Sequence, residues 1–174
     1  SRAAKYFLNL YDANPKALAT SQSLYAYPVS GSWDMGTGRS YDNPQTADGC
    51  SWKYRYNETN GTLWASGSGA EDGAGGVWYS SSIAPAASAS LNHKSQDLKI
   101  DVTGTVNAWL NGTIVNDGFL VKRSGSVGNN NPSASEGNTD RLGNFSFFSS
   151  NTNTIFPPTL EAVWDDSAWS TGSL

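Results

Sequence analysis

The residue types that carry out catalysis are scarce in this sequence. It holds one histidine, His93, which lies in a polar stretch, and one cysteine, Cys50. A hydrolase needs a nucleophile with a base, or a pair of carboxylates, and no Gly-x-Ser-x-Gly motif is present. The adjacent carboxylates Glu71-Asp72 and Asp165-Asp166 are typical of solvated acidic loops. A zinc site needs three or four nitrogen or sulfur ligands, more than one histidine and one cysteine supply. We therefore expect a protein that is not an enzyme.

Three aspartates at the ends of predicted strands indicate a different chemistry. Asp12, Asp101 and Asp165 each stand at such an end. Calcium needs only oxygen ligands, which strand ends of a β-sandwich can supply. The chain has no Asp-x-Asp-x-Asp-Gly loop, which would mark a dedicated calcium site. Structural calcium held by these three residues is one prediction, and plain surface aspartates are the alternative.

Aromatic residues are the other group with a chemical use. The chain has seven tryptophans and eight tyrosines, and a sugar ring stacks its apolar face on a flat aromatic side chain. Trp64, Trp78 and Tyr79 border glycine-rich stretches, so we predict that they face solvent and form a carbohydrate-binding site. Packing in the core or at the sandwich edge is the alternative for these three. The tryptophans in patterned positions are predicted to be core residues: Trp33, Trp52, Trp109 and Trp164.

The segment from Leu98 to Val121 predicts the elements that would position these residues. Leu98, Ile100 and Val102 alternate at strand spacing. Val106, Trp109 and Leu110 then fall on one helical face with Val102. Asn111-Gly112 ends the helix because both residues tolerate positive φ, and a strand restarts at Gly118.

Further strands are predicted elsewhere, at residues 5–12, 22–29, 50–56, 62–65, 77–80, 142–149 and 159–165. Residues 31–49 and 124–139 are predicted loops, and the Pro/Ala/Ser-rich residues 83–90 are predicted to be a linker. The pattern indicates an all-β, two-sheet antiparallel jelly-roll sandwich with one short helix near residues 103–111.

Length and composition limit the remaining possibilities. A chain of 174 residues suits a single domain spanning 1–174. Only 15% of residues are charged, and the net charge of −4 argues against a nucleic-acid partner. No apolar run is long enough to insert into a membrane. Because Cys50 is the only cysteine in the sequence, no internal disulfide can form. Cys50 is predicted to be a small buried residue. The ends, Ser1 and Leu174, lead us to expect a processed chain or a piece of a longer one.

A family resemblance rests on several motifs in order. Val102-Thr103, Val106 and Trp109 form V-T-x-x-V-x-x-W, and Asn116-Asp117-Gly118 follows as N-x-G. Two tryptophan segments precede them and a pattern of F-x-S-S then P-x-L-x-V follows: Ser32-Trp33-Asp34, Ser51-Trp52, 145–150 and 157–163. Residues 5 to 165 thus resemble the DNRLRE or disaggregatase-related domain. The resemblance implies a helix-containing jelly roll, and some members of that group are carbohydrate-binding modules.

Two functions are compatible with these observations. We predict first a non-catalytic structural or adhesive virion domain of a tailed bacteriophage, as a tail, fibre or capsid-decorating component. Low charge and long polar loops favour it, and residues 32–39 and 158–167 resemble segments of phage structural proteins. Its partners would be other virion proteins or copies of itself, with host-surface polysaccharide as a further contact. The alternative is a carbohydrate-binding module of a secreted or cell-surface protein.

Overall fold

The computed structural model describes residues 4–14, 21–39, 42–44, 46–52, 54–56, 61–64, 76–79, 82–91, 97–123 and 143–165. The elements, in chain order, are β1 (Lys5–Leu10), β2 (Gln22–Pro28), β3 (Ala87–Leu91), β4 (Leu98–Asp101), α1 (Thr103–Leu110), β5 (Phe119–Arg123) and β6 (Thr159–Val163). Among the described residues, no helix has the length and apolar character needed to cross a membrane.

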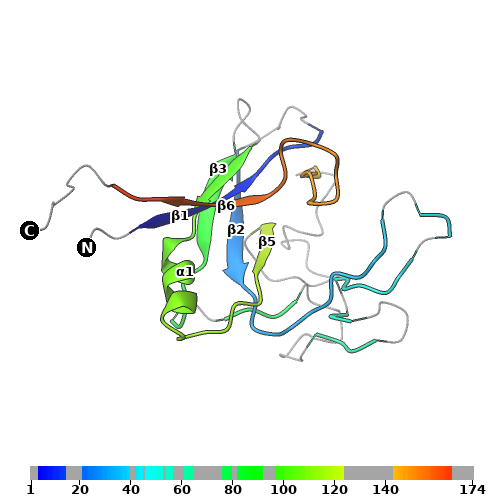
Figure 1. The fold of residues 1–174 in the computed structure, drawn as a ribbon, viewed down its shortest axis with the longest axis horizontal. Coiled ribbons are helices and arrows are strands. Elements are labelled where there is room, and N and C mark those ends of the chain that lie inside the picture. Colours follow the sequence, from blue (N-terminus) through cyan, green and yellow to red (C-terminus); the bar gives the residue numbers. More distant parts are fainter. Residues whose placement is uncertain are drawn as a thin grey trace, which may run out of the picture.

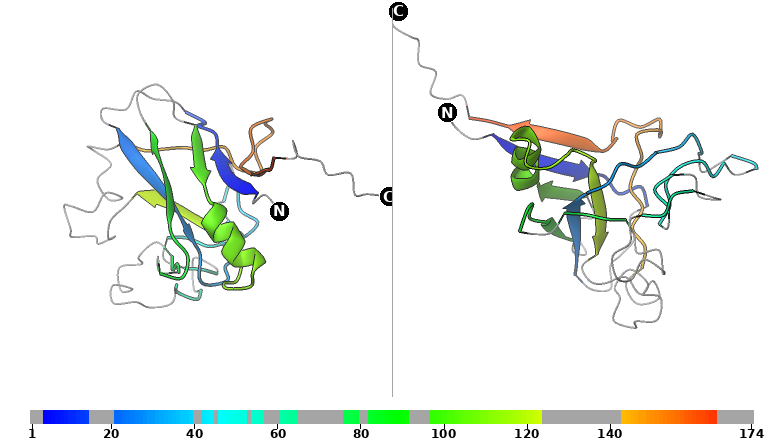
Figure 2. Two further views of the ribbon diagram at one scale, coloured as in Figure 1. Left: turned by 90° about the vertical axis from the view of Figure 1, so that its left-hand side faces the viewer. Right: turned by 90° about the horizontal axis from the view of Figure 1, so that it is seen from below.

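The strands form two three-stranded antiparallel sheets, in the orders β4-β1-β6 and β3-β2-β5 (Figure 1). Figure 2 shows the two sheets from two further sides, with α1 at the end of the first sheet where β1 begins. This arrangement confirms the predicted all-β, two-sheet, jelly-roll-like sandwich with one short helix. β3 contacts β4, so the sheets meet along that side of the sandwich.

Alternation along β1 decides which side chains enter the core. Tyr6, Leu8 and Leu10 pack against the core, whereas Phe7 and Asn9 lie on the opposite face of the sheet. The buried core itself comes from both sheets and the helix, and its members are Leu24, Ala26, Leu91, Leu98, Ile100, Val102 and Val106. The strands β2, β3 and β4 and the helix therefore bury apolar surface together that none could bury alone.

The helix is anchored to β1 at its first turn. The Tyr6 backbone N–H donates to Thr103 Oγ1 at 2.9 Å, and the Val102 N–H donates to the Tyr6 carbonyl at 2.9 Å. At the other end Gly112 takes φ +69° and donates its N–H to the Trp109 carbonyl, as expected of a helix stop. Val106 and Trp109 face the core as predicted, but Leu110 is 68% exposed, which corrects its predicted place on the buried face.

Residues 83–90 correct the predicted linker, because Ala87–Leu91 is strand β3. Its small side chains alternate between the two faces, and Leu91 is fully buried at the end of the strand. β3 pairs along its whole length with β2, from Gln22 opposite Leu91 to Ala26 opposite Ala87. Pairing with a neighbour distant in the sequence thus makes a strand from residues of low intrinsic strand preference.

In the described residues, four of the predicted strands form only isolated β-bridges. In residues 50–56 and 62–65 only Tyr54 and Leu63 form a bridge. Residues 77–79 contribute the bridge of Trp78 to Val29, and residues 143–149 contribute that of Phe147 to Asp12. In contrast, the predicted strands at 5–12, 22–29 and 159–165 are confirmed as β1, β2 and β6.

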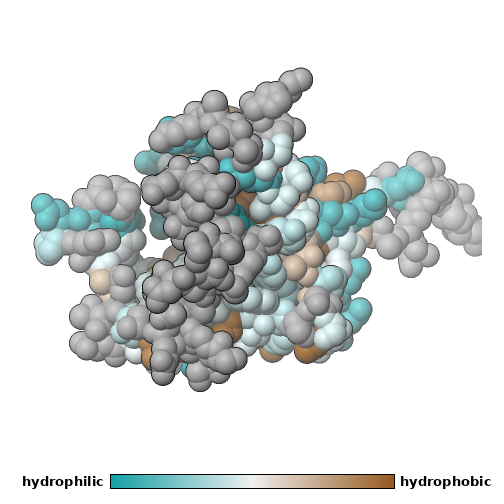
Figure 3. Space-filling model, turned by 180° about the vertical axis from the view of Figure 1, so that it is seen from behind, coloured by the Kyte–Doolittle hydropathy of each residue, from teal (hydrophilic) through white to brown (hydrophobic). Residues whose placement is uncertain are grey.

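Three of the tryptophans predicted as core residues are exposed. Trp33 is 40%, Trp52 43% and Trp164 65% exposed, whereas Trp109 packs against the core with its ring 4.7 Å from that of Phe119. Strand-like alternation around Trp52 and Trp164 predicted burial, but neither residue lies in a strand, and both are exposed among the described residues. On the face shown in Figure 3, the described surface is mostly polar, with apolar residues in separate patches.

Candidate functional site

Three tryptophans gather around one apolar hollow at an end of the sandwich. Trp33, Trp52 and Trp64 line it, together with Val29, Phe119, Leu120, Cys50, Ser51 and Gly76. The hollow has a volume of about 210 Å³. We refer to these nine residues as the tryptophan hollow.

The floor of the tryptophan hollow belongs to the β3-β2-β5 sheet. Val29 directly follows β2, and Phe119 and Leu120 begin β5. The Val29 N–H donates to the Gly118 carbonyl at 3.0 Å, which fixes these two segments against each other. The floor is therefore set by the sheet rather than by the loops.

The walls are non-strand segments held by backbone hydrogen bonds. The Cys50 N–H donates to the Asp34 carbonyl at 2.7 Å, and the Asp34 N–H donates to the Arg55 carbonyl at 3.0 Å. Arg55 in turn donates its N–H to the Thr62 carbonyl at 2.9 Å. These hydrogen bonds hold the segments that contain Trp33, Trp52 and Trp64 next to one another.

The loop before Cys50 closes tightly because glycine occupies its points of closest approach. Gly36 has φ +71°, and a Cβ on it would lie 2.5 Å from the backbone of Gly49. Asp48 ties the same loop, accepting from the Thr37 N–H at 2.9 Å and the Thr37 hydroxyl at 2.6 Å. These hydrogen bonds lower the pKa of Asp48, so its carboxylate stays ionised at neutral pH.

The indole N–H groups of two of the tryptophans are already used inside the protein. Trp33 Nε1 donates to the Asp117 carbonyl at 2.7 Å, and Trp64 Nε1 donates to the Ser51 carbonyl at 3.0 Å. These bonds hold the rings in place and leave their flat faces as the surface offered to a ligand.

The chemistry available in the hollow is apolar contact. Cys50 is exposed, which corrects its prediction as a buried residue. Partial burial of its thiol, and then the nearby Asp34 carboxylate, raise the pKa of Cys50, so the thiol remains protonated at neutral pH. A protonated thiol is a poor nucleophile, and the hollow offers ring faces rather than reactive groups.

The structure separates the three residues of the predicted carbohydrate site. Trp64 lines the tryptophan hollow, but Trp78 packs with its ring 5.2 Å from that of Tyr27 and 4.9 Å from Lys122 Nζ. The Tyr79 N–H donates to the Pro28 carbonyl at 3.0 Å. Trp78 and Tyr79 are half-buried beside β2 and do not line the hollow.

Trp33 and Trp52 are the hollow residues that the sequence prediction missed. Both are flanked by or lie close to the glycine-rich residues 31–49, as Trp64 borders another glycine-rich stretch. The same criterion that selected Trp64 would have selected them. Treating residues 50–56 as a regular strand placed Trp52 in the core instead.

The predicted calcium ligands are not brought into one site. Asp101 lies opposite Phe7 in the sheet, whereas Asp12 follows the other end of β1 and accepts from the Asn14 N–H at 2.8 Å. Asp165 is exposed two residues after β6. Within the described ranges, no group of three His, Cys, Asp or Glu residues could hold a metal ion. His93, Glu71, Asp72 and Asp166 lie outside the described residues.

Comparisons with known proteins identify no family for this chain. No family model matches the chain, and neither the curated proteins nor the solved structures include a significant match. The resemblance to the DNRLRE or disaggregatase-related domain therefore stays a prediction from the sequence motifs.

Proposed function

We propose that this chain is a non-catalytic β-sandwich that acts by surface contact, and that the tryptophan hollow holds the apolar face of a saccharide ring. The observation that carries the proposal is the convergence of Trp33, Trp52 and Trp64 on one hollow, with two of the three substantially exposed. A pyranose has one apolar face and a rim of hydroxyls, so it suits flat aromatic faces at an open surface.

The size of the hollow limits what it can enclose. Its volume of about 210 Å³ is below that of ordinary small-molecule pockets, which begin at about 300 Å³. It therefore suits one ring of a longer chain, with the remaining rings outside. Binding through a single stacked ring is weak, and many copies acting together would be needed for firm attachment. The proposed membership of the DNRLRE group points the same way, since some of its members bind carbohydrate.

The second candidate is the structural role in a tailed-bacteriophage virion, with other virion proteins or further copies of the chain as partners. The observation that favours it is a set of exposed apolar side chains before, on and after the edge strand β6, at Ile155, Phe156, Leu160, Val163 and Trp164. Exposed apolar side chains mark protein contacts where they form one contiguous patch. The two proposals are compatible, because a virion domain can also contact host polysaccharide.

The test is a glycan-binding screen read by tryptophan fluorescence, with and without calcium. We expect saturable quenching by at least one polysaccharide. The double variant W33A/W52A should weaken that binding by about tenfold or more, because it removes the stacking faces. Trp164→Ala is the matched control, since it removes an exposed tryptophan just after β6 that is not part of the hollow.

Two results would contradict this proposal in different ways. Unchanged affinity in W33A/W52A would show that the hollow is not the binding site. No binding to any glycan, by a protein that melts cooperatively, would favour the purely structural role. If binding requires calcium, the prediction of a calcium ion is supported, but Asp12, Asp101 and Asp165 do not hold it together as one site.

A further inference from the structure

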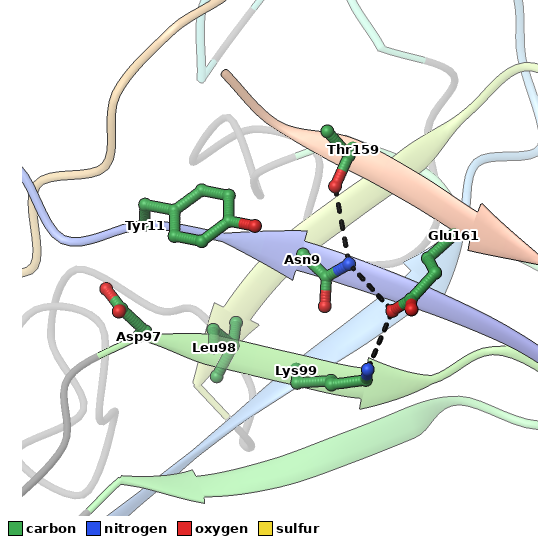
Figure 4. Close-up of a pocket in the computed structure, with 7 residues that line it drawn as sticks. All are labelled: Asn9, Tyr11, Asp97, Leu98, Lys99, Thr159 and Glu161. Carbon is green, nitrogen blue, oxygen red and sulfur yellow. Dashed lines mark hydrogen bonds and ion pairs between the residues drawn. The ribbon is translucent and has the colours of Figure 1, made fainter. Parts of the chain in front are cut away.

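The outward face of the β4-β1-β6 sheet carries a second hollow, of different chemistry. It has a volume of about 550 Å³. Seven residues line it: Leu98 and the polar or aromatic Asn9, Tyr11, Asp97, Lys99, Thr159 and Glu161 (Figure 4). We refer to these seven residues as the sheet groove.

Strand register places these polar residues together. Asn9 of the central strand β1 lies opposite Lys99 of β4 on one side and Thr159 of β6 on the other. Figure 4 shows Asn9 in the middle, Tyr11 and Asp97 toward one end, and Glu161 with Lys99 toward the other. The groove is thus built on three paired strands, which position its side chains more firmly than loops would.

One hydrogen-bonded array crosses the three strands. Asn9 Nδ2 donates to Thr159 Oγ1 at 3.3 Å and to Glu161 Oε2 at 3.3 Å, and Lys99 Nζ donates to the same Glu161 oxygen at 2.6 Å. Both protons of the Asn9 amide are therefore used, and within the described part of the chain no group donates to Asn9 Oδ1. That oxygen remains available to accept a hydrogen bond from a ligand hydroxyl.

The charges of the groove select against anions. Its one ammonium, on Lys99, is paired with Glu161, and Asp97 adds a second carboxylate, so the groove carries a net charge of −1. Hydrogen bonds from Lys99 and then Asn9 lower the pKa of Glu161, which keeps its carboxylate ionised at neutral pH. An anionic ligand would meet net repulsion, whereas hydroxyls or an ammonium would meet acceptors.

An aromatic ring completes the groove. Tyr11 lines it and packs with its ring 5.4 Å from that of Phe156, which supports the tyrosine from the side. An aromatic face beside amide, carboxylate and hydroxyl groups matches both surfaces of a sugar ring.

Because Lys99 and Glu161 are solvent-exposed, their pairing adds little to folding stability.

We propose that the sheet groove is a second saccharide site, which binds neutral or amino-bearing sugars and rejects anionic ones. Tyr11 supplies the apolar platform, Asn9 Oδ1 and the carboxylates of Asp97 and Glu161 accept hydrogen bonds from the ligand, and Lys99 and Thr159 donate hydrogen bonds to it. This inference rests on the proposed saccharide contact and extends it, because two sites on one domain let a polysaccharide bind at both.

The experiment titrates the full chain with short oligomers of glucose, glucosamine and galacturonic acid, followed by calorimetry and by amide chemical shifts. Each titration is repeated in W33A/W52A, which removes the tryptophan hollow. We expect glucose or glucosamine oligomers to bind that double variant and galacturonate to bind least. Adding Asn9→Ala or Tyr11→Ala should weaken this remaining binding by about tenfold, as expected for losing a hydrogen bond or a stacking face.

Two further variants separate charge from structure. Glu161→Gln keeps the side-chain size and an acceptor oxygen but removes a negative charge, so it should weaken glucosamine binding and strengthen galacturonate binding. Val163→Ala is the matched control, because Val163 is exposed on β6 and does not line the groove. Tyr11→Ala leaves the central three-strand array intact, so it tests the site even if Asn9→Ala fails to fold.

The outcomes distinguish this inference from the proposed function. If Asn9→Ala and Tyr11→Ala change no affinity while W33A/W52A abolishes binding, the sheet groove is not a site and the proposed function stands. Tightest binding by galacturonate would also overturn the inference. If no oligomer binds the wild-type protein, both proposals are wrong.

Discussion

At the scale of single residues, Asp101 links the end of β4 to the start of α1. We predicted it as a calcium ligand, and in the structure its carboxylate accepts a hydrogen bond from the Thr103 N–H at 3.1 Å. The Thr103 hydroxyl and then the Thr103 backbone N–H lower the pKa of Asp101. Asp101 lies one residue before Val102, the N-cap of α1, which makes no side-chain capping bond, so this hydrogen bond supports the first residue of the helix.

That lowered pKa predicts how stability depends on pH. A carboxyl group with a lower pKa in the folded protein stabilises the fold at pH values above its unfolded pKa, about 3.9. This contribution is lost as the pH falls through the folded pKa. Asp101→Asn should therefore reduce the free energy of unfolding near pH 7 by at most about 1 kcal/mol, because the residue is exposed.

The measurement is urea unfolding of wild type and Asp101→Asn between pH 7 and pH 3. We expect the difference between the two proteins to shrink as the pH falls below about 4. A difference that stayed constant across this range would mean that the charge of Asp101 does not contribute to helix initiation.

At the scale of elements, α1 is stabilised by packing more than by its own sequence. Its eight residues are too few for a stable isolated helix. Only Thr105 and Val106 are buried among them, and Val106 packs with Val102 against Ile100 and the other core residues. The helix therefore depends on the side chains that it places in the core.

A pair of substitutions in the same helix tests this dependence. Val106→Ala removes buried methyl groups and should lower the free energy of unfolding by about 2 kcal/mol. Leu110→Ala is the control, because Leu110 is 68% exposed, and it should change stability by no more than about 0.5 kcal/mol. Chemical denaturation followed by circular dichroism measures both. Equal losses would mean that Leu110 is buried, as the sequence pattern predicted.

At the scale of the whole molecule, the two sheets meet where β3 contacts β4. In the described part of the chain, Leu160 of the edge strand β6 is 51% exposed, although it lies opposite Leu8, which packs against the core. Edge strands with exposed apolar side chains present unpaired backbone groups to other chains. The β6 edge is where the proposed virion contacts would form.

The exposed edge predicts association between copies of the chain. We expect the mass measured by sedimentation to rise with protein concentration, and the double variant L160S/W164S to remain smaller under the same conditions. Leu110→Ser is the control, since it removes an exposed leucine on α1 instead. A wild-type chain that stays monomeric at all concentrations would contradict assembly through copies of itself.

Local periodicity was enough to predict much of the fold. The alternation in β1, β2 and β4, the helical spacing of Val106 and Trp109, and the Asn111-Gly112 stop all depend on neighbours within a few residues. The all-β class follows from these segments, and so does the position of the single helix.

The remaining features depend on which distant segments pair with or cover a residue in the folded chain, so only the tertiary structure decided them. β3 is a strand because it pairs with β2, and Trp52 lies outside the strands of the described residues and is 43% exposed. Likewise, Asn9, Lys99 and Glu161 meet only through the register of three strands that are far apart in the sequence. Sequence spacing sets which face of an element a side chain occupies, whereas long-range pairing sets what that face meets.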